Sequence, residues 1–443
     1  MSKKVALHNL GCKVNAYEVE AMQQLLEKAG YEIVPFEEGA DIYLINTCTV
    51  TNIADRKSRQ MLHKAKKMNP DAIVVATGCY VQTDTQKLEA DSAVDLILGN
   101  NQKKQIVEAL EEYEKEHAKK VKVIEINKTK EYEDLSIGYT AEHVRAYIKV
   151  QDGCNQFCTY CIIPYARGRV RSRKIAEVLE EVRTLAARGY KEVVLTGIHL
   201  SSYGLDFPKE ERESLLSLIQ AVHEVDGIAR IRLGSLEPRI ITEEFMEGVS
   251  ALPKVCPHFH LSLQSGCDRT LKNMNRRYSA PEYAEKCELI RRFYPAPALT
   301  TDVIVGFPME TEEDFEDSYE FVKNIHFYET HIFKYSRRQG TKAAAMDGQL
   351  TEAVKAQRSE KMLKLHEIRA KEYETAMIGR TLELLLEEEV EIGGKTYFMA
   401  HSKEYVRAVI EKTDAHKVND LVKAKAVDFA DEHVLLAICE DLY

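Results

Sequence analysis

The stretch Gly153-Cys154-Asn155-Gln156-Phe157-Cys158-Thr159-Tyr160-Cys161 places three cysteines on one short loop, directly after the apolar run 147–150. This C-x3-C-x2-C spacing lets three thiolates bind three irons of a [4Fe–4S] cluster, and it leaves the fourth iron without a protein ligand. A structural zinc site usually has four ligands in two pairs, and the sequence has no second C-x2-C. Coincidental burial of three cysteines is the other alternative. The spacing favours an iron–sulfur cluster at Cys154, Cys158 and Cys161, whose open iron can bind a substrate or cofactor.

Three further cysteines lie far apart in the sequence but share one local pattern. Each follows an apolar strand-like run and a short turn, in Leu7-His8-Asn9-Leu10-Gly11-Cys12, Leu44-Ile45-Asn46-Thr47-Cys48 and Val75-Ala76-Thr77-Gly78-Cys79. Because the carboxyl ends of parallel strands lie on one edge of a sheet, we expect Cys12, Cys48 and Cys79 to converge there. Independent burial at strand ends is the alternative, since cysteine is often buried. The repetition favours a second site with three thiolates.

Strand-like and helix-like segments alternate over the first 110 residues and again from about 145 to 333, which is typical of parallel α/β sheets. Six strand-like runs in the second stretch suit a partial βα barrel better than a complete eightfold one. They are 147–150, 193–195, 231–233, 260–263, 302–305 and 331–335. A long charged helix is expected over 351–378, and five short strand-like runs after it suggest a small barrel resembling an OB fold.

The predicted fold class is therefore α/β, with three domains. An N-terminal parallel α/β sheet domain is expected at 1–125, a central partial βα barrel at 140–375, and a small all-β barrel at 376–443.

Composition and charge limit the possible classes of protein. The chain has 443 residues and a formal net charge of −10. No apolar run approaches the roughly 18 residues that span a bilayer, so no membrane segment is indicated. The first residues lack the apolar core of a signal peptide, and we expect a cytoplasmic protein. Ten cysteines are then not expected to form a disulfide framework. Histidines such as His8 and His63 show no ligand spacing, so surface or core roles are expected.

A basic strip follows the cysteine loop. Residues 145–174 carry seven Lys or Arg against one Asp, although the whole chain is acidic. A charge run is usually a solvated surface, but one beside a cluster loop suits contact with nucleic-acid phosphates. We therefore predict RNA contacts by Arg167, Arg169, Arg171 and Arg173. Residues 379–443 carry eight Lys or Arg against fourteen Asp or Glu, so this barrel is expected to use few RNA contacts, such as His401 and Arg407, or mainly to position the core.

The C-x3-C-x2-C loop resembles the signature of the radical S-adenosylmethionine (SAM) superfamily. Together with three N-terminal runs, this loop resembles the radical-SAM methylthiotransferases, and the resemblance covers essentially the whole chain. The runs are Gly11-Cys12-Lys13-Val14-Asn15, Asn46-Thr47-Cys48-Thr49-Val50-Thr51-Asn52 and Thr77-Gly78-Cys79. Later runs fit as well, including Arg232-Leu233-Gly234-Ser235-Leu236-Glu237-Pro238, Leu261-Ser262-Leu263-Gln264-Ser265-Gly266 and Asp302-Val303-Ile304-Val305-Gly306-Phe307-Pro308. The resemblance implies a methylthiotransferase domain, a radical-SAM core and a C-terminal barrel of TRAM type.

The resemblance also implies the cofactors. One [4Fe–4S] cluster, at the loop cysteines, binds SAM and supplies the electron that splits it into a deoxyadenosyl radical. A second [4Fe–4S] cluster, at Cys12, Cys48 and Cys79, supplies or carries the sulfur, to which another SAM donates a methyl group. An electron donor and a sulfur source are then needed as partners.

By position in the family pattern, the resemblance assigns SAM contacts. They are Tyr160 near the adenine, Thr196 and Gly197 at the methionine, Ser235 and Glu237 at the ribose, and Gln264 and Arg276 near the methionine carboxylate. One departure is visible, because Met309 stands where the family usually has glycine. If that turn needs a positive φ, Met309 implies a changed local backbone.

The closest resemblance is to the branch that methylthiolates carbon 2 of threonylcarbamoyladenosine at position 37 of tRNA. Lys13-Val14-Asn15 and the run 49–60 carry it, where the isopentenyladenosine branch usually has Gln-Met-Asn and a Ser-Val-Arg run. The isopentenyladenosine enzyme, a methylthiotransferase acting on a ribosomal-protein aspartate, and an RNA-binding protein with structural clusters are the alternatives. The arginines around 167–173 and 276–277 are expected to suit the threonylcarbamoyl carboxylate.

Overall fold

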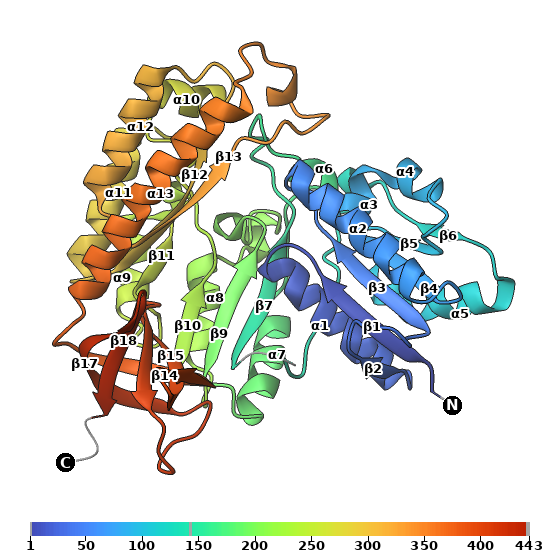
Figure 1. Cartoon of the computed structure of the whole chain (residues 1–443), viewed down its shortest axis with the longest axis horizontal. Coiled ribbons are helices and arrows are strands. Elements are labelled where there is room, and N and C mark those ends of the chain that lie inside the picture. Colours follow the sequence, from blue (N-terminus) through green and yellow to red (C-terminus); the bar gives the residue numbers. More distant parts are fainter. Residues whose placement is uncertain (1, 141–143, 440–443) are drawn as a thin grey trace.

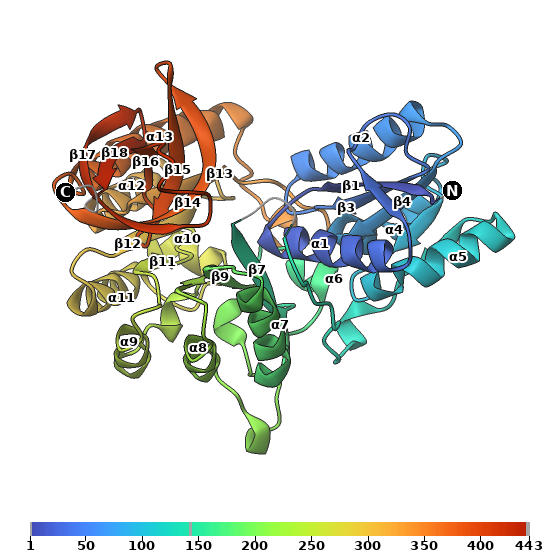
Figure 2. The ribbon, with the colours of Figure 1, turned by 90° about the horizontal axis from the view of Figure 1, so that it is seen from below.

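The computed structural model describes residues 2–140 and 144–439, whose strands form three open sheets and a closed barrel. The N-terminal sheet lies at one end of the molecule and the C-terminal barrel at the other, with the central sheets between them (Figure 1). Figure 2 shows the same arrangement from below. The predicted α/β architecture is confirmed. Residues 440–443 of the expected third domain lie outside the described residues.

The N-terminal sheet has six parallel strands in the order β2-β1-β3-β4-β5-β6. They are β1 (Lys4–Asn9), β2 (Glu32–Val34), β3 (Ile42–Thr47), β4 (Ile73–Gly78), β5 (Leu96–Leu98) and β6 (Lys120–Lys122). Every residue of β3 is buried, because helices cover both faces of the sheet.

Helices of this domain bury two separate apolar layers. On one face, α1 (Lys13–Lys28) and α5 (Ile106–Glu116) pack Met22 and Ile106 over Leu44. On the other face, α2 (Asn52–Met68) packs Leu62. The short helices α3 (Cys79–Thr83) and α4 (Thr85–Glu89) follow β4.

Six parallel strands form the predicted partial barrel, in two sheets. They are β7 (Arg145–Asp152), β9 (Glu192–Gly197) and β10 (Arg230–Leu233), then β11 (His258–His260), β12 (Ala298–Val305) and β13 (Glu329–Lys334). Isolated bridges between Ile231 and Val255 and between Leu236 and Leu261 join the two sheets. The short strand β8 (Arg171–Ser172) pairs antiparallel with β7. Two strands depart clearly from their predicted ranges: β12 begins at Ala298, although 302–305 is predicted, and β11 is displaced from 260–263. It ends earlier, and Gln264 soon after it has a φ of 73°.

Helices cover the partial barrel, and all of them except α6 share one core with its strands. They are α6 (Ile163–Arg167), α7 (Ile175–Ala187), α8 (Leu215–His223), α9 (Glu243–Ser250), α10 (Asp268–Asn273), α11 (Ala280–Phe293), α12 (Glu312–Ile325) and α13 (Glu352–Thr375). The last begins at Thr351, whose side chain accepts a hydrogen bond from the Val354 N–H. It matches the long helix expected over 351–378.

The C-terminal barrel closes through five strands, as the sequence predicts. They are β14 (Thr381–Ile392), β15 (Lys395–Ser402), β16 (Arg407–Glu411), β17 (Leu421–Asp431) and β18 (Val434–Cys439). Two fully buried arginines of β10 attach it to the core. Arg230 Nη1 donates to the His401 carbonyl at 3.0 Å, and Arg232 Nη1 donates to the Lys403 carbonyl at 3.0 Å. Within the described residues, no helix has both the length and the apolar character to cross a bilayer.

Candidate active site

The three N-terminal cysteines lie at the carboxyl ends of adjacent parallel strands. Cys12 caps α1 after β1, Cys48 follows β3, and Cys79 follows β4. Burial raises the pKa of the Cys48 thiol to about 11, and the neighbouring thiols of Cys79 and Cys12 add to this shift. The structure therefore brings the three sulfurs together at one edge of the sheet.

Two glycines keep the space between these thiols open. Gly11 and Gly78 have φ values of 120° and 98°, which disfavour other residues. A Cβ at Gly78 would lie 2.4 Å from Oδ1 of Asn46, and one at Gly11 would lie 3.3 Å from Sγ of Cys48. Side chains at either position would crowd the turns that carry the thiols, so the chain leaves room for a group held by the three sulfurs.

The loop cysteines form a second group of thiols, on the core after β7. Nη1 of Arg276 donates to Sγ of Cys158 at 3.3 Å, and the Gln156 N–H donates to Sγ of Cys154 at 3.4 Å. Burial raises the pKa of Cys154 to about 11 and that of Cys161 to about 12. Thiolates at these positions therefore need a bound cation, and iron in a three-cysteine site provides one.

Three of the four arginines predicted to contact RNA are buried. Arg167, Arg171 and Arg173 have relative exposures of 0%, 0% and 2%. Arg173 pairs with the buried Glu181, while Arg171 donates to the carbonyl oxygens of Arg167 and Arg169. The prediction of phosphate contact is wrong for these three, because their guanidinium groups bind internal partners. Arg169 is exposed, so its RNA contact stays a prediction.

Arg167 lies at the centre of a buried ion network that joins the N-terminal domain to the core. Its Nη1 lies 2.9 Å from Glu18 of α1 and 3.2 Å from Asp152 of β7. Lys149 pairs with the same two carboxylates at 2.8 and 2.7 Å, and Lys103 pairs with Glu18 at 3.1 Å. Burial alone would raise the pKa of Glu18, but the three cations outweigh burial and hold that pKa well below its usual value.

Cations outnumber carboxylates in this network. In the described residues, the cations of this network lie within ion-pair distance of only two carboxylates, Glu18 and Asp152. The four cations are Lys103, Lys149, Arg167 and Arg171. Arg167 Nε donates instead to Sγ of Cys79 at 3.2 Å. Because a buried excess of positive charge is costly, it calls for a nearby anion. Thiolates of the N-terminal cysteines, with an anionic iron–sulfur group between them, fit that need.

A cavity of about 550 Å³, called here the central cavity, opens beside Cys12. Three of the assigned SAM residues line it, which are Thr196, Gly197 and Ser235. Tyr160 and Gln264 line a second cavity of about 210 Å³ together with Cys161. Asp302 lines both cavities, so its carboxylate lies between the cavity beside Cys12 and the cavity beside Cys161.

The other two residues assigned to SAM, Arg276 and Glu237, line neither of these two cavities. Arg276 reaches Cys158, as described above, and also donates through Nε to the Tyr278 hydroxyl at 2.9 Å. Glu237 accepts a hydrogen bond from Nε of Arg239 at 2.7 Å. The structure therefore brings Arg276 to the loop cysteines, but it pairs Glu237 with a neighbouring guanidinium.

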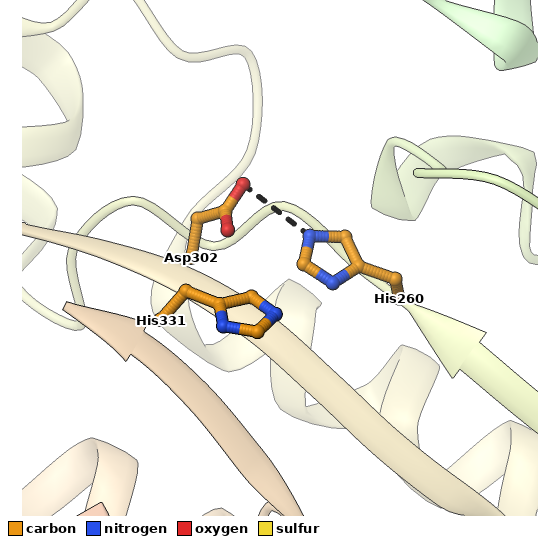
Figure 3. Close-up of side chains that lie close together, drawn as sticks. All are labelled: His260, Asp302 and His331. Carbon is orange, nitrogen blue, oxygen red and sulfur yellow. Dashed lines mark ion pairs between the residues drawn. The ribbon is translucent and has the colours of Figure 1, made fainter. Parts of the chain in front are cut away.

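The sequence reasoning missed one group of titratable side chains in the central cavity. His260, Asp302 and His331 come from β11, β12 and β13, and each offers a ligand atom within 4.8 Å of the others' (Figure 3). Nε2 of His260 lies 3.3 Å from Oδ2 of Asp302. The spacing of the histidines in the sequence does not indicate this proximity, so whether the pair binds a ligand stays untested. The order of the strands could have indicated this group, because Asp302 and His331 are direct partners across the neighbouring strands β12 and β13.

Asp302 is the one carboxylate of this group, and His260 lies beside it. Burial raises the pKa of Asp302, but the hydrogen bond and charge of His260 outweigh burial and lower it. Nδ1 of His260 is also 3.0 Å from the Thr300 hydroxyl. His260 and Asp302 therefore form a paired, polar wall of the central cavity.

The C-terminal barrel contributes Tyr405 to the central cavity. Its ring stacks on His258 with centroids 4.9 Å apart, and the Arg232 guanidinium lies 4.8 Å from its centroid. His401 is buried, and its Nδ1 is 2.7 Å from Glu387, so the suggested RNA contact by His401 is wrong. These contacts fit a barrel that positions the core.

Met309 has the positive-φ backbone conformation that a glycine at this position would favour. Its φ is 65°, so the expectation of a changed local backbone is wrong. The side chain is 44% exposed, which avoids crowding, and its N–H donates to the Gly348 carbonyl at 2.9 Å.

Known proteins resemble the chain along nearly all of its length. Residues 4–99 match the family described as uncharacterized protein family UPF0004, and residues 148–322 match the radical SAM superfamily. The threonylcarbamoyladenosine tRNA methylthiotransferase MtaB of Bacillus subtilis is 41% identical over 95% of this chain and 93% of its own. The chain belongs to the radical SAM methylthiotransferase family. It is thus a radical SAM tRNA methylthiotransferase, and membership implies SAM and a [4Fe–4S] cluster as cofactors.

Other members and folds agree with this membership. MtaB of Aquifex aeolicus is 44% identical over 87% of this chain and 93% of its own. A tRNA-2-methylthio-N(6)-dimethylallyladenosine synthase of Moorella thermoacetica is 38% identical over 85% of each chain. Among solved structures, the radical SAM methyltransferase TsrM of Kitasatospora setae has a TM-score of 0.57 at 16% identity, with 75% of each chain covered. At that identity the likeness concerns the fold alone.

Proposed function

We propose that this methylthiotransferase modifies carbon 2 of threonylcarbamoyladenosine at position 37 of tRNA. One structural observation supports the chemistry best. Cys12 and Cys161 belong to two separate groups of thiols, and they line two cavities that share Asp302. A substrate carbon placed between these groups can meet a radical from one side and sulfur from the other. The MtaB relatives, named for threonylcarbamoyladenosine, support the choice of substrate.

We assign the loop cysteines to the cluster that binds SAM, and the N-terminal cysteines to a second [4Fe–4S] cluster. When bound, these groups and SAM supply one-electron chemistry and sulfur at the target carbon. The expected domains then have separate tasks: 1–125 provides the sulfur side, 140–375 the SAM side, and 376–443 positions the core. An electron donor and a sulfur source complete the proposed partners.

The residues of the chain have defined tasks in this proposal. Arg276 orients Cys158 through its hydrogen bond to Sγ. Thr196, Gly197 and Ser235 provide polar contacts for SAM along the central cavity, while Tyr160 and Gln264 do so in the second cavity. The target base must leave its stack to enter, which costs a few kcal/mol and is easiest in a single-stranded loop. Arg169, exposed beside the cysteine loop, is the proposed phosphate contact.

A comparison of four substrates tests the proposal. The reconstituted enzyme receives tRNA carrying threonylcarbamoyladenosine, isopentenyladenosine or unmodified adenosine, and separately a ribosomal protein. We expect a methylthio product from the first tRNA and little from the others. Preferential modification of the isopentenyl tRNA, for which the Moorella relative is named, would overturn the substrate assignment.

A further inference from the structure

Lys13 places a positive charge on the wall of the central cavity. It is the first residue of α1, it follows Cys12 directly, and it lines the cavity. Among the described residues, its ammonium group forms no ion pair and no side-chain hydrogen bond. Its Nζ lies 6.0 Å from the centroid of the Tyr147 ring. Lys13 therefore lines the cavity as a cation without an ion-pair partner among the described residues.

Neighbouring cations are already neutralised. Arg145 lies 3.0 Å from Glu387, and Arg232 lies 2.8 Å from Glu192. Lys13 is also the one lysine or arginine among the residues that line the central cavity in the described chain. Any anion that enters this cavity therefore meets Lys13 as its nearest unpaired cation.

The carboxylates of the cavity do not satisfy Lys13. Asp302 is paired with His260, and Glu329, which also lines the cavity, forms no ion pair with Lys13 within the described residues. The start of α1 adds the positive end of a helix dipole, so this position favours a negative partner. The cavity wall is thus complementary to an anionic ligand.

We propose that Lys13 binds the carboxylate of the threonylcarbamoyl group and so selects this nucleoside, an inference that rests on the proposed function. The urea N–H of the threonine end can close a hydrogen-bonded ring with N1 of its own adenine. That conformation places the carboxylate on the same edge of the base as carbon 2. Since Lys13 adjoins Cys12, a carboxylate held by Lys13 directs carbon 2 toward the N-terminal cysteines.

This assignment replaces the arginines expected from the sequence, because Arg169 and Arg277 are exposed but do not line the central cavity, and the other four have partners. Arg167, Arg171 and Arg173 are buried in internal contacts, and Arg276 is bound to Cys158. An isopentenyl group has no charge, so it gains nothing from Lys13 and leaves the ammonium desolvated without a partner. The same lysine thus attracts one modified base and disfavours the other.

The test pairs variants of the enzyme with two forms of one substrate. The substrates are anticodon stem-loops with threonylcarbamoyladenosine, either with the free carboxylate or with the carboxylate converted to its amide. The variants are Lys13→Met, Lys13→Arg, and Lys28→Met as a control at the exposed end of the same helix. Binding is measured by fluorescence anisotropy, product by mass spectrometry, and iron per chain confirms that each variant is loaded.

We expect Lys13→Met to lower binding and kcat/KM about 10- to 100-fold for the carboxylate substrate, because a charge-assisted hydrogen bond is lost. For the amide substrate, Lys13→Met should match the wild type. Lys13→Arg should recover much of the loss, and Lys28→Met should change nothing. Equal losses on both substrates, or no loss on either, would overturn the inference.

Failure of the proposed function gives a different result from failure of the Lys13 assignment. If the wild type forms no methylthio product from the carboxylate substrate, the proposed substrate is wrong. The binding comparison then still decides on Lys13, because preference for the carboxylate over the amide does not require turnover. Loss of that preference in Lys13→Met supports the role of Lys13, and its persistence contradicts it.

Discussion

Nε of Arg167 donates a hydrogen bond to Sγ of Cys79 at 3.2 Å, so a guanidinium of the radical SAM core contacts a cysteine of the N-terminal sheet. The same guanidinium pairs with Glu18 and Asp152. The N-terminal sulfur site and the docking of the two domains therefore depend on one side chain, and disturbing either is expected to disturb the other.

Replacing Arg167 with methionine tests this dependence. Glu18 would keep Lys103 and Lys149, but it would lose its hydrogen bonds from the buried guanidinium, and a hydrogen bond to a charged group typically contributes about 1.5–3 kcal/mol. We expect a loss of that size in the free energy of unfolding, measured with denaturant, and less iron bound at the N-terminal cysteines. Arg169→Met is the matched control, because a change at this exposed residue should stay within about 0.5 kcal/mol. Similar stabilities for the two variants would contradict the network.

The salt dependence of tRNA binding separates exposed from buried arginines. Removing a phosphate contact lowers the slope of log K against log salt concentration by about 0.7–0.9. We expect that decrease for Arg169→Met and no change of slope for Arg173→Met, whose guanidinium pairs internally with Glu181. Binding titrations at several salt concentrations provide the measurement. If the slope falls for Arg173→Met, the buried arginine contacts RNA after all.

Substituting the two groups of cysteines should separate the two chemistries. Alanine at Cys154, Cys158 and Cys161 should abolish conversion of SAM to 5′-deoxyadenosine. Alanine at the N-terminal cysteines should preserve that conversion, halve the bound iron and stop sulfur insertion, because each group holds one cluster. Iron analysis and product chromatography give both readouts. Full iron and full thiolation in the N-terminal variant would refute the second cluster.

The contact between the C-terminal barrel and α13 should depend on pH. Nδ1 of His433 lies 3.0 Å from Glu374, and its Nε2 lies 2.9 Å from Glu367. Burial lowers the pKa of His433, but the two glutamates outweigh burial and raise it above the usual 6.5. A histidine with a raised pKa stabilises the fold fully below its unfolded pKa, and this stabilisation is lost as the pH rises through the folded value.

His433→Gln should therefore lower the free energy of unfolding at about pH 6 and leave it nearly unchanged at about pH 9. Urea denaturation at both pH values measures the difference. His416→Gln serves as the control, because the His416 ring forms no ion pair within the described residues. Equal losses at the two pH values for His433→Gln would show that the histidine acts through packing alone.

Local sequence patterns were sufficient for the fold and for the position of the N-terminal cysteines at one edge of the sheet. Strand–turn–cysteine repeats place Cys12, Cys48 and Cys79 on adjacent strands, because parallel strands end at one edge. The same patterns failed for Arg167, because its partner Glu18 lies far away in the sequence, and for Arg173, because only the packing of α7 against the core buries its nearby partner Glu181. Burial of a charge depends on its three-dimensional partners, and local charge density does not report them.

Local sequence patterns also could not predict which residues meet in the central cavity. His260, Asp302 and His331 meet because three strands are neighbours in the partial barrel, although the residues are well separated in sequence. Lys13 was visible in a motif, but its free ammonium group could be recognised only once the cavity beside Cys12 was known.

The most direct test of the central claim is mass spectrometry of tRNA nucleosides from a host that lacks its own enzyme, with and without this chain. The account predicts that the chain converts threonylcarbamoyladenosine into its 2-methylthio derivative, and that the loop-cysteine variant does not. Unchanged threonylcarbamoyladenosine in the presence of the iron-loaded wild-type chain, or methylthio isopentenyladenosine in its place, would contradict it.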